Sequence, residues 1–375
     1  MLQGRAAGLQ LSLRERVALI LLPVSAGAMP SLQPVLLGGL HEVGQLEAGQ
    51  IGGIAALEAL GMALAIILAP SFKPLHQPTR AALVGISLLA FANALTGLAG
   101  GQIGLEILRA VAGLGGGLLL SVFITCLSRQ ADPTRDFAIY VTLQALWGTA
   151  FSVTVTQIAQ ARWGPQAPYV VLAVIDLALF LLIRALPGAD AVVVQRARAR
   201  PPLAGVAGLI GTGLFLCGVM ALWSYAPLLL TRGPNGISMA LAAPLALGMH
   251  VLGGVVAAFA SRLSPYRISV IGPLVLVVCA GTIGAMPPRA VLLAALTIFS
   301  FVWMLVPPFH LALLVKIDAT LRAAPYTSSS HLIGLMLGPL VSSWAWSAGG
   351  PTGVVLAACA LLTGAAIAPL MAAIS

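Results

Sequence analysis

The chain has few charged residues for its length. Only 8% of its 375 residues are Asp, Glu, Lys or Arg, whereas 59% are hydrophobic and the mean hydropathy is +1.03. About a quarter of the residues in a soluble domain are charged, so this composition excludes a soluble globular protein. It is typical of a polypeptide that spends most of its length in a lipid bilayer.

Acidic residues are the scarcest charged groups, with 10 Asp and Glu against 19 Lys and Arg, which gives a net charge of +9. The chain has no basic stripe and no alternation of basic and aromatic residues, so we expect no nucleic-acid partner. Nucleophile elbows, metal-ligand clusters, Walker loops and dinucleotide fingerprints are also missing from the sequence. We therefore expect no cofactor, no metal and no enzymatic activity. The four cysteines lack the spacing of a metal site and are predicted to be free thiols.

Long apolar runs fill most of the chain. A helix of about 20 predominantly apolar residues crosses a bilayer, and its backbone groups are satisfied within the segment. Twelve runs of roughly this length are separated by charges and by turn-forming Pro, Gly and Asn residues. The predicted spans are 17–40, 47–70, 80–98, 102–127, 137–159, 168–187, 203–230, 237–261, 268–286, 290–315, 327–347 and 352–374.

The basic residues are distributed unevenly among the gaps between these runs. Fifteen fall in gaps on one side, Arg162, Arg232 and Arg289 fall on the other, and Arg109 lies inside a run. Short loops rich in Lys and Arg face the cytoplasm. The pattern predicts a multi-pass protein of a bacterial-type inner membrane with both termini in the cytoplasm.

The longest connection on the basic side, 188–202, divides the chain into an N-terminal bundle at 1–187 and a C-terminal bundle at 203–375. The two parts look related, because Asp132, Tyr140 and Gly148 recur 186 residues later, each in the corresponding cytoplasmic loop or following span. The recurring residues are Asp318, Tyr326 and Gly334. This pattern predicts a duplicated six-helix unit.

The fourth run carries Arg109 followed by Gly113, Gly115, Gly116 and Gly117. Steps of four and three place Arg109, Gly113 and Gly116 on one helix face, where glycine allows another helix to approach closely. Together with twelve runs in two related halves, this stretch resembles the major facilitator superfamily. The resemblance implies two pseudo-symmetric six-helix bundles and transport of a solute, with the first, fourth, seventh and tenth helices lining a central cavity.

Two features of that family are weak in this chain. The loops at 71–80 and 254–267 keep basic residues but lack the acidic residue of the family motif. The fifth span lacks the Gly-Pro pair that resembles the antiporter branch, and Gly338-Pro339 occurs instead in the eleventh span. These departures argue against a drug–proton antiporter without excluding one.

Four ionisable residues lie at bilayer depth in the first half. Inserting each of these side chains into the bilayer costs about 2.5–3.5 kcal/mol, so we expect each to have a structural or functional role. Glu106 and Arg109 are three residues apart and are expected to face each other, either as a self-neutralising pair or with Arg109 lining the cavity. Glu58 is either a helix-packing carboxyl or a proton-coupling site. Asp176 is a further coupling candidate, although a structural role is favoured because the sixth helix usually faces lipid or scaffold in the family.

The second half offers aromatic and imidazole groups instead of carboxylates. We predict that Trp223, Tyr225, His250 and Trp303 bind the substrate, together with Arg109 and with Gln33, which lies among the prolines of the first span. For His250 a neutral core histidine is the favoured alternative.

The sequence thus predicts a secondary active transporter of a small organic solute that works by alternating access and is coupled to a gradient of protons or another ion. Drug or metabolite efflux remains an alternative, and so does a lipid-handling or receptor-like protein on the same fold. The expected partners are the solute, the ion and the lipid bilayer, and we expect a monomer.

Overall fold

The computed structural model describes residues 11–69, 72–96, 98, 101–127, 133–188, 200–260, 262–320 and 322–374, and within them every regular element is a helix. The α-helices of the first half are α1 (Leu13–Leu21), α2 (Val24–Glu42), α3 (Ile51–Leu68), α4 (Pro78–Thr96), α5 (Gln102–Leu127), α6 (Pro133–Thr154), α7 (Gln160–Trp163) and α8 (Ala167–Ile183). Those of the second half are α9 (Leu203–Ser224), α10 (Ala226–Leu230), α11 (Met239–Phe259), α12 (Pro265–Ala285), α13 (Arg289–Leu305), α14 (Pro307–Ile317) and α15 (Thr327–Ile374). A π-helical turn, η4 (Val155–Ala159), joins α6 to α7.

Eight of the described helical segments are long and apolar enough to cross a membrane, and the bent pair α13–α14 makes a ninth if it is counted as one span. Helix α15, with 48 residues, covers the last two predicted spans, and its path breaks at Gly349 and Gly350. Gly350 has a φ of 56°, a conformation that glycine adopts without strain. The helical, multi-span class is confirmed, whereas the count of twelve spans stays a prediction.

Proline sets several helix boundaries, as its missing N–H and fixed φ require. Pro78, Pro133, Pro265 and Pro307 each open a helix. Pro23 lies at the break between α1 and α2, whereas Pro30 and Pro34 remain inside α2. The tenth predicted span is broken before Pro307, where α13 and α14 are bent by 42° relative to each other.

The glycine-rich part of α5 packs against three helices rather than one. A Cβ on Gly113 would overlap the carbonyl oxygen of Glu58 on α3, and a Cβ on Gly115 would lie 2.6 Å from the carbonyl oxygen of Gly85 on α4. Gly116 faces Ala26 of α2. The predicted close approach of another helix at these glycines is confirmed, with α3 approaching at Gly113 and α2 at Gly116. This packing brings α3, α4 and α2 close to α5 along the turns that follow Arg109.

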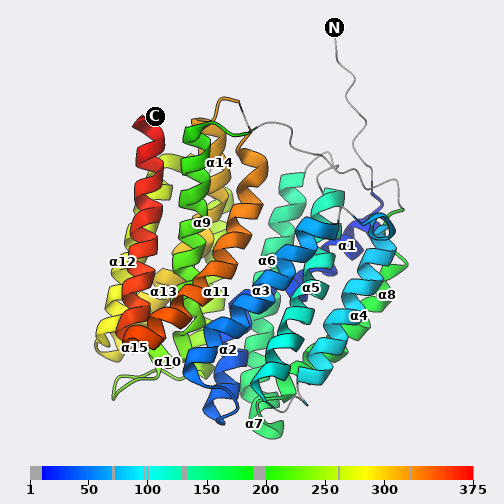
Figure 1. Ribbon diagram of the computed structural model, residues 1–375, viewed down its shortest axis with the longest axis horizontal. Coiled ribbons are helices and arrows are strands. Elements are labelled where there is room, and N and C mark those ends of the chain that lie inside the picture. The colour runs from blue at the N-terminus through cyan, green and yellow to red at the C-terminus, as the bar shows by residue number, and fades with distance from the viewer. Residues whose placement is uncertain are drawn as a thin grey trace.

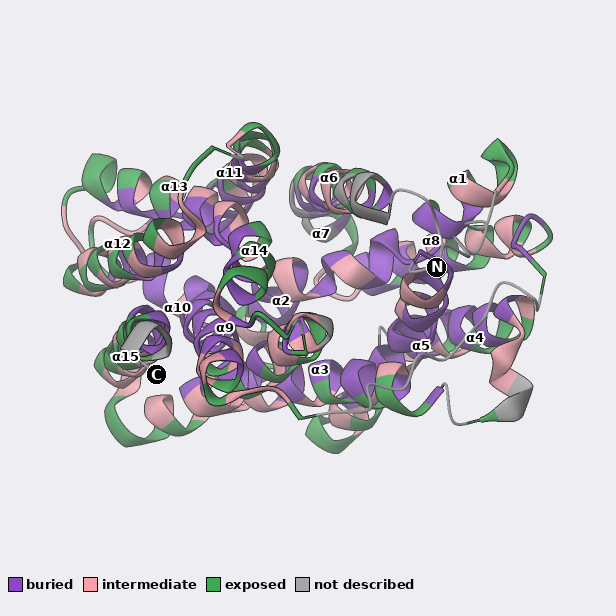
Figure 2. Cartoon of the chain, turned by 90° about the horizontal axis from the view of Figure 1, so that it is seen from above, coloured by how far each residue is buried: buried purple, intermediate pink, exposed green. Residues whose placement is uncertain are grey.

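The helices form two groups, α1–α8 and α9–α15, which Figure 1 shows side by side and Figure 2 shows from above. Helices α3 and α15 pack together across the groups, and so do α6 and α11. Gly148 of α6 faces Ala28 of α2, and Gly334 of α15 faces Gly213 of α9, which are equivalent helix pairs under the predicted duplication. The bundle boundaries themselves stay a prediction. Residues 189–199 of the expected linker lie outside the described residues, as do Asp132 and the basic residues Arg5, Arg129, Arg196 and Arg198.

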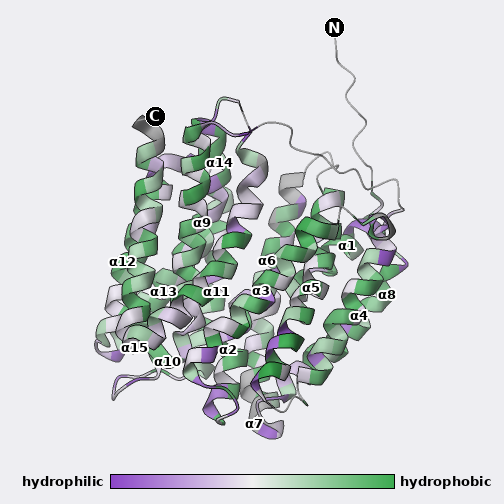
Figure 3. Ribbon diagram, viewed as in Figure 1, coloured by the Kyte–Doolittle hydropathy of each residue, from purple (hydrophilic) through white to green (hydrophobic). Residues whose placement is uncertain are grey.

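Hydrophobic residues occur along most of the length of the helices (Figure 3), and many of them are exposed on the outside of the protein. Large apolar side chains on it include Leu181 at 80% exposure, Leu203 at 80% and Phe259 at 84%. Such a surface fits a surrounding of hydrocarbon rather than water. Buried polar side chains are therefore the residues that need an explanation.

Candidate functional site

Arg109 lies at the centre of a buried polar network in the first half. Its side chain is 1% exposed, and its Nη1 donates to Oε1 of Glu58 on α3 at 3.4 Å. Its Nη2 donates to Oδ1 of Asn93 at 2.7 Å and to Oγ1 of Thr96 at 3.0 Å, both on α4. The ring of Tyr169 on α8 lies under the guanidinium, with Cζ 5.0 Å from the ring centroid. The charge is thus held by hydrogen bonds, an ion pair and a cation–π contact.

The network extends from Asn93 to a second carboxylate. Asn93 Nδ2 donates to Oδ2 of Asp176 at 2.7 Å, and Ser25 Oγ on α2 lies 3.2 Å from Oδ1 of the same carboxylate. Asp176 is fully buried, whereas Val174 and Leu177 on α8 are 62% and 55% exposed. Helix α8 therefore turns its apolar side outward and its aspartate inward. We call Ser25, Glu58, Asn93, Thr96, Arg109, Tyr169 and Asp176 the arginine network.

Glu106 does not belong to this network. Its Oε1 accepts a hydrogen bond from Gln102 Nε2 at 2.7 Å, and Gln102 in turn contacts Gln50 of η1 (Ala48–Gln50) at 2.6 Å. The predicted pair between Glu106 and Arg109 is wrong, because the ion pair of Arg109 is with Glu58. The spacing of three residues places Glu106 near Arg109 on one helix, but the guanidinium of Arg109 turns toward α3 and α4 instead.

Gln33 lies on α2 and is 2% exposed. Its Nε2 donates to the carbonyl oxygen of Ala55 at 3.3 Å, and its Oε1 is a buried acceptor without a partner among the described residues. Ala55 precedes Glu58 by about one turn of α3. Gln33 therefore lies beside the same helix as Glu58 and has one acceptor available.

Three of the four substrate-binding residues predicted in the second half form one aromatic cluster. The rings of His250 and Trp303 meet edge to face at 4.3 Å, and Trp223 lies 5.7 Å from Trp303 and 6.3 Å from His250. All three are at most 4% exposed, and His250 Nε2 has no hydrogen-bond partner in the part of the chain that the structure describes. Trp223 Nε1 donates to the carbonyl oxygen of Ser31 in the first half at 3.0 Å. The aromatic cluster thus touches the helix that carries Gln33 and Ser25.

Tyr225 is separate from this cluster. It lies at the junction of α9 and α10, and its ring stacks on Trp346 of α15 at 5.2 Å. The structure therefore brings together Trp223, His250 and Trp303 but directs Tyr225 elsewhere.

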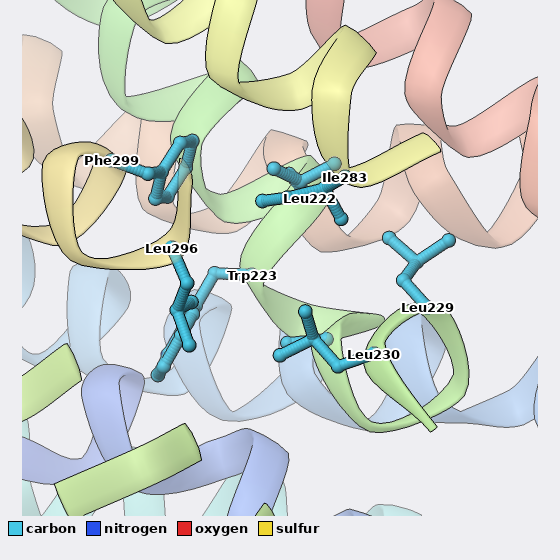
Figure 4. Close-up of a pocket in the computed structure, with 8 residues that line it drawn as sticks. Leu222, Trp223, Leu229, Leu230, Ile283, Leu296 and Phe299 are labelled. Carbon is cyan, nitrogen blue, oxygen red and sulfur yellow. The ribbon is translucent and has the colours of Figure 1, made fainter. Parts of the chain in front are cut away.

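A small cavity lies beside Trp223 of the aromatic cluster. This cavity has a volume of about 10 Å³ and an entirely apolar lining, most of which is labelled in Figure 4. A cavity of this size holds at most about one water molecule, and the absence of polar partners keeps it dry. Its lining residues are Leu222, Trp223, Ala226, Leu229, Leu230, Ile283, Leu296 and Phe299.

A larger groove lies elsewhere, between α6, η4, α7 and α8. Its volume is about 350 Å³, and apart from Thr154 its lining side chains are apolar, including Trp147, Phe151 and Trp163. It contains no member of the arginine network. The predicted site residues therefore do not line it.

Several partners in the arginine network were not predicted from the sequence as site residues. Asn93 is the one asparagine inside a predicted span, and Thr96 and Tyr169 also lie near span ends. An arginine at bilayer depth requires several acceptors, so a search of the neighbouring spans for amides and hydroxyls would have pointed to Asn93.

No family model matches this sequence, and no curated protein matches it either. Its structure is similar to a nucleoside transporter, NupG, in a D323A mutant with a TM-score of 0.73 at 12% identity, covering 96% of this chain and 99% of that one. A second structure of NupG gives a TM-score of 0.72 at 11% identity, covering 96% and 98%. FucP, a major facilitator superfamily transporter solved in its outward conformation, gives 0.64 at 15% identity, covering 95% and 98%. The chain is therefore a multi-pass membrane protein with the fold of the major facilitator superfamily transporters.

Proposed function

We propose that this protein is a secondary active transporter that moves a small organic solute across a bacterial-type inner membrane and is driven by a proton gradient. The observation that carries the proposal is the arginine network. It buries Arg109, Glu58 and Asp176 at 3% exposure or less among helices that are otherwise apolar. Ionisable groups at bilayer depth are expensive to insert and mark ion or substrate pathways.

The fold supports the choice of transport over other membrane functions. The similar structures carry the names of a nucleoside transporter and of a major facilitator superfamily transporter. Transporters built from two repeats bind substrate near the midplane between them and rock one repeat against the other. Here the arginine network in the first half and the aromatic cluster in the second half meet at α2, through Ser25 and Ser31. We assign the solute to this junction, with Arg109 or Gln33 meeting a polar group and Trp223 packing on an apolar face.

The contacts between the two groups of helices support a state that is closed on the outer side. Those that support this state join the middle of α2 and the start of α3 to α9, α10 and α15, whereas α6 packs against α11 as a further contact between the groups. The basic-residue pattern assigns this end of the bundle to the outside. The contacts are the hydrogen bond from Trp223 to Ser31, the hydrogen bond from Ser343 to the Gly49 carbonyl at 2.6 Å, and the tight approaches of Gly52 to Pro339 and of Gly38 to Pro227.

The proposal is tested in two steps. A thermal-shift screen of the purified protein against nucleosides, sugars and other small metabolites identifies a ligand, because a compound that binds only the folded state at 100 times its Kd stabilises it by about 2.7 kcal/mol. Accumulation of that ligand is then measured in reconstituted vesicles with and without a pH gradient.

Glu58→Gln is the test variant and Glu106→Gln is the matched control, since Glu106 lies on the same helix as Arg109 but outside its network. We expect Glu58→Gln to lose proton-driven accumulation while it keeps ligand binding, and Glu106→Gln to resemble the wild type. Undiminished accumulation by Glu58→Gln contradicts proton coupling through the network. Exchange of lipids between vesicles without solute movement would instead favour a lipid-handling protein.

A further inference from the structure

The arginine network contains one more carboxylate than it has cations. Arg109 is its one basic residue among the described residues, and Glu58 and Asp176 are both buried with it. A buried charge is tolerated when it is paired, and breaking a buried pair costs about 3–5 kcal/mol. With both carboxylates ionised, the network would hold an uncompensated negative charge. The charge balance therefore requires one bound proton, carried by either Glu58 or Asp176.

The direction of the hydrogen bonds distinguishes these two carboxyl groups. A guanidinium can only donate, so the Asn93 atom that faces Arg109 at 2.7 Å must be its oxygen. The Asn93 amide nitrogen then points to Asp176 Oδ2 at 2.7 Å and donates to it. A proton on that oxygen would collide with the amide hydrogens. Ser25 Oγ lies 3.2 Å from the other oxygen of Asp176. Because a hydroxyl can donate as well as accept, both oxygens of an ionised Asp176 have a donor available.

Arg109 binds Glu58 more weakly than it binds Asn93. Arg109 contacts only Oε1 of Glu58, and the distance of 3.4 Å is well beyond the 2.7–2.9 Å of a charge-assisted bond between ionised partners. The guanidinium instead makes its short contacts to Asn93 and Thr96. Arg109 is thus hydrogen-bonded to Asn93, which in turn is hydrogen-bonded to Asp176. Glu58 is the carboxyl group that can take up a proton without losing a short hydrogen bond.

We propose that Glu58 carries the single exchangeable proton of the network, that Asp176 stays ionised, and that Asn93 is a positioning residue that holds Arg109 toward Asp176. This inference rests on the proposed proton-coupled transport and names the proton carrier within it. When Glu58 releases its proton to water, its carboxylate competes for the guanidinium with Asn93 and Thr96. Proton release therefore moves Arg109 toward α3, and proton binding returns it toward α4.

Isotope-edited infrared spectroscopy on the wild-type protein in membranes tests the assignment. At neutral pH we expect a protonated-carboxyl C=O band that shifts when the protein contains glutamate labelled with ¹³C at its carboxyl group and does not shift with labelled aspartate. The band should vanish in Glu58→Gln and persist in Glu106→Gln. A band that shifts with labelled aspartate, or no protonated-carboxyl band at neutral pH, overturns the assignment.

The positioning role of Asn93 has its own readout, the midpoint pH at which the band disappears on titration. In Asn93→Ala and Asp176→Asn, Arg109 is released to pair with Glu58, and an opposite charge at close range favours the ionised carboxylate by about one to three pH units. We expect both variants to lower the midpoint and Asn93→Gln to restore it in part. An unchanged midpoint in both variants refutes the positioning role. Uptake measured in the same vesicles separates this inference from the transport proposal, because a missing proton-driven uptake beside an unchanged glutamate band contradicts only the function.

Discussion

The close contact between α5 and α3 at Gly113 holds Arg109 and Glu58 in register, and Gly113→Ala tests it. A Cβ at this position would overlap the carbonyl oxygen of Glu58. The obstacle is backbone, which cannot rotate aside like the end of a flexible side chain, so α5 must move away from α3. Overpacking of this kind costs about 1–3 kcal/mol. Replacing glycine by alanine inside a helix also contributes about 0.8–1.0 kcal/mol in the stabilising direction.

Gly248→Ala is the matched control. Gly248 lies inside α11, and a Cβ there would have no neighbouring atom within 4 Å. The helix-propensity gain is common to both variants and cancels when they are compared. The difference between their unfolding free energies, about 1–3 kcal/mol, then isolates the cost of the contact.

Chemical unfolding in mixed detergent micelles measures both variants under the same conditions. We expect Gly113→Ala to be the less stable of the two and to lose proton-driven uptake, because the shift of α5 lengthens the 3.4 Å contact between Arg109 and Glu58. Gly248→Ala should keep both properties. Equal stability of the two variants would refute the packing argument, and normal uptake by Gly113→Ala would refute the requirement for this register.

Two further predictions concern the proposed closure of the outer side. They share one reporter, the rate at which an impermeant thiol reagent added outside labels a cysteine introduced at Gln33. Gly52→Val should increase this rate, because any side chain there meets the carbonyl oxygen of Pro339 and prevents α3 from closing on α15; an unchanged rate in a folded protein would contradict it. Trp223→Phe keeps an aromatic ring, although a smaller one, and removes the donor to the Ser31 carbonyl. Loss of one hydrogen bond worth about 0.5–1.5 kcal/mol should shift the opening equilibrium by roughly two- to tenfold. A rate equal to that of the wild type would show that this bond does not hold the outer side closed.

The sequence predicted the helical class and the key ionisable residues because charge stands out against apolar runs. Arg109, Glu58 and Asp176 are conspicuous for that reason alone. Their hydrogen-bond partners are not conspicuous in the sequence. A small polar residue such as Asn93 or Thr96 is tolerated in a membrane helix and barely changes the hydropathy of the apolar run. Packing decides which helix faces which, and the glycine spacing of α5 predicted a close helix approach without identifying α2, α3 and α4 as the neighbours.

The positions of residues along the chain also led to two wrong predictions about which side chains lie together. The interval of three residues between Glu106 and Arg109 permits an intrahelical pair, but Gln102 satisfies the glutamate one turn earlier. Tyr225 follows Trp223 by two residues, yet a helix break at Tyr225 separates α9 from α10 and the side chain packs on Trp346. The first outcome depends on which of two neighbours on the same helix binds Glu106, and the second depends on Trp346, which only the tertiary structure brings to Tyr225.

Helix α2 is the element through which the two halves of the proposed mechanism are connected. Its Ser25 contacts Asp176 in the arginine network, and its Ser31 accepts the hydrogen bond from Trp223 of the aromatic cluster about two turns further on. Gln33 ties the same stretch to α3. Pro30 and Pro34 remove backbone donors within this segment, which makes it the least restrained part of the helix. A change in the position of Arg109 that alters the Asp176 contacts therefore acts on the same helix that holds the outer side closed. We expect proton release and outer opening to be linked through displacement of α2 rather than through a direct contact between Arg109 and Trp223.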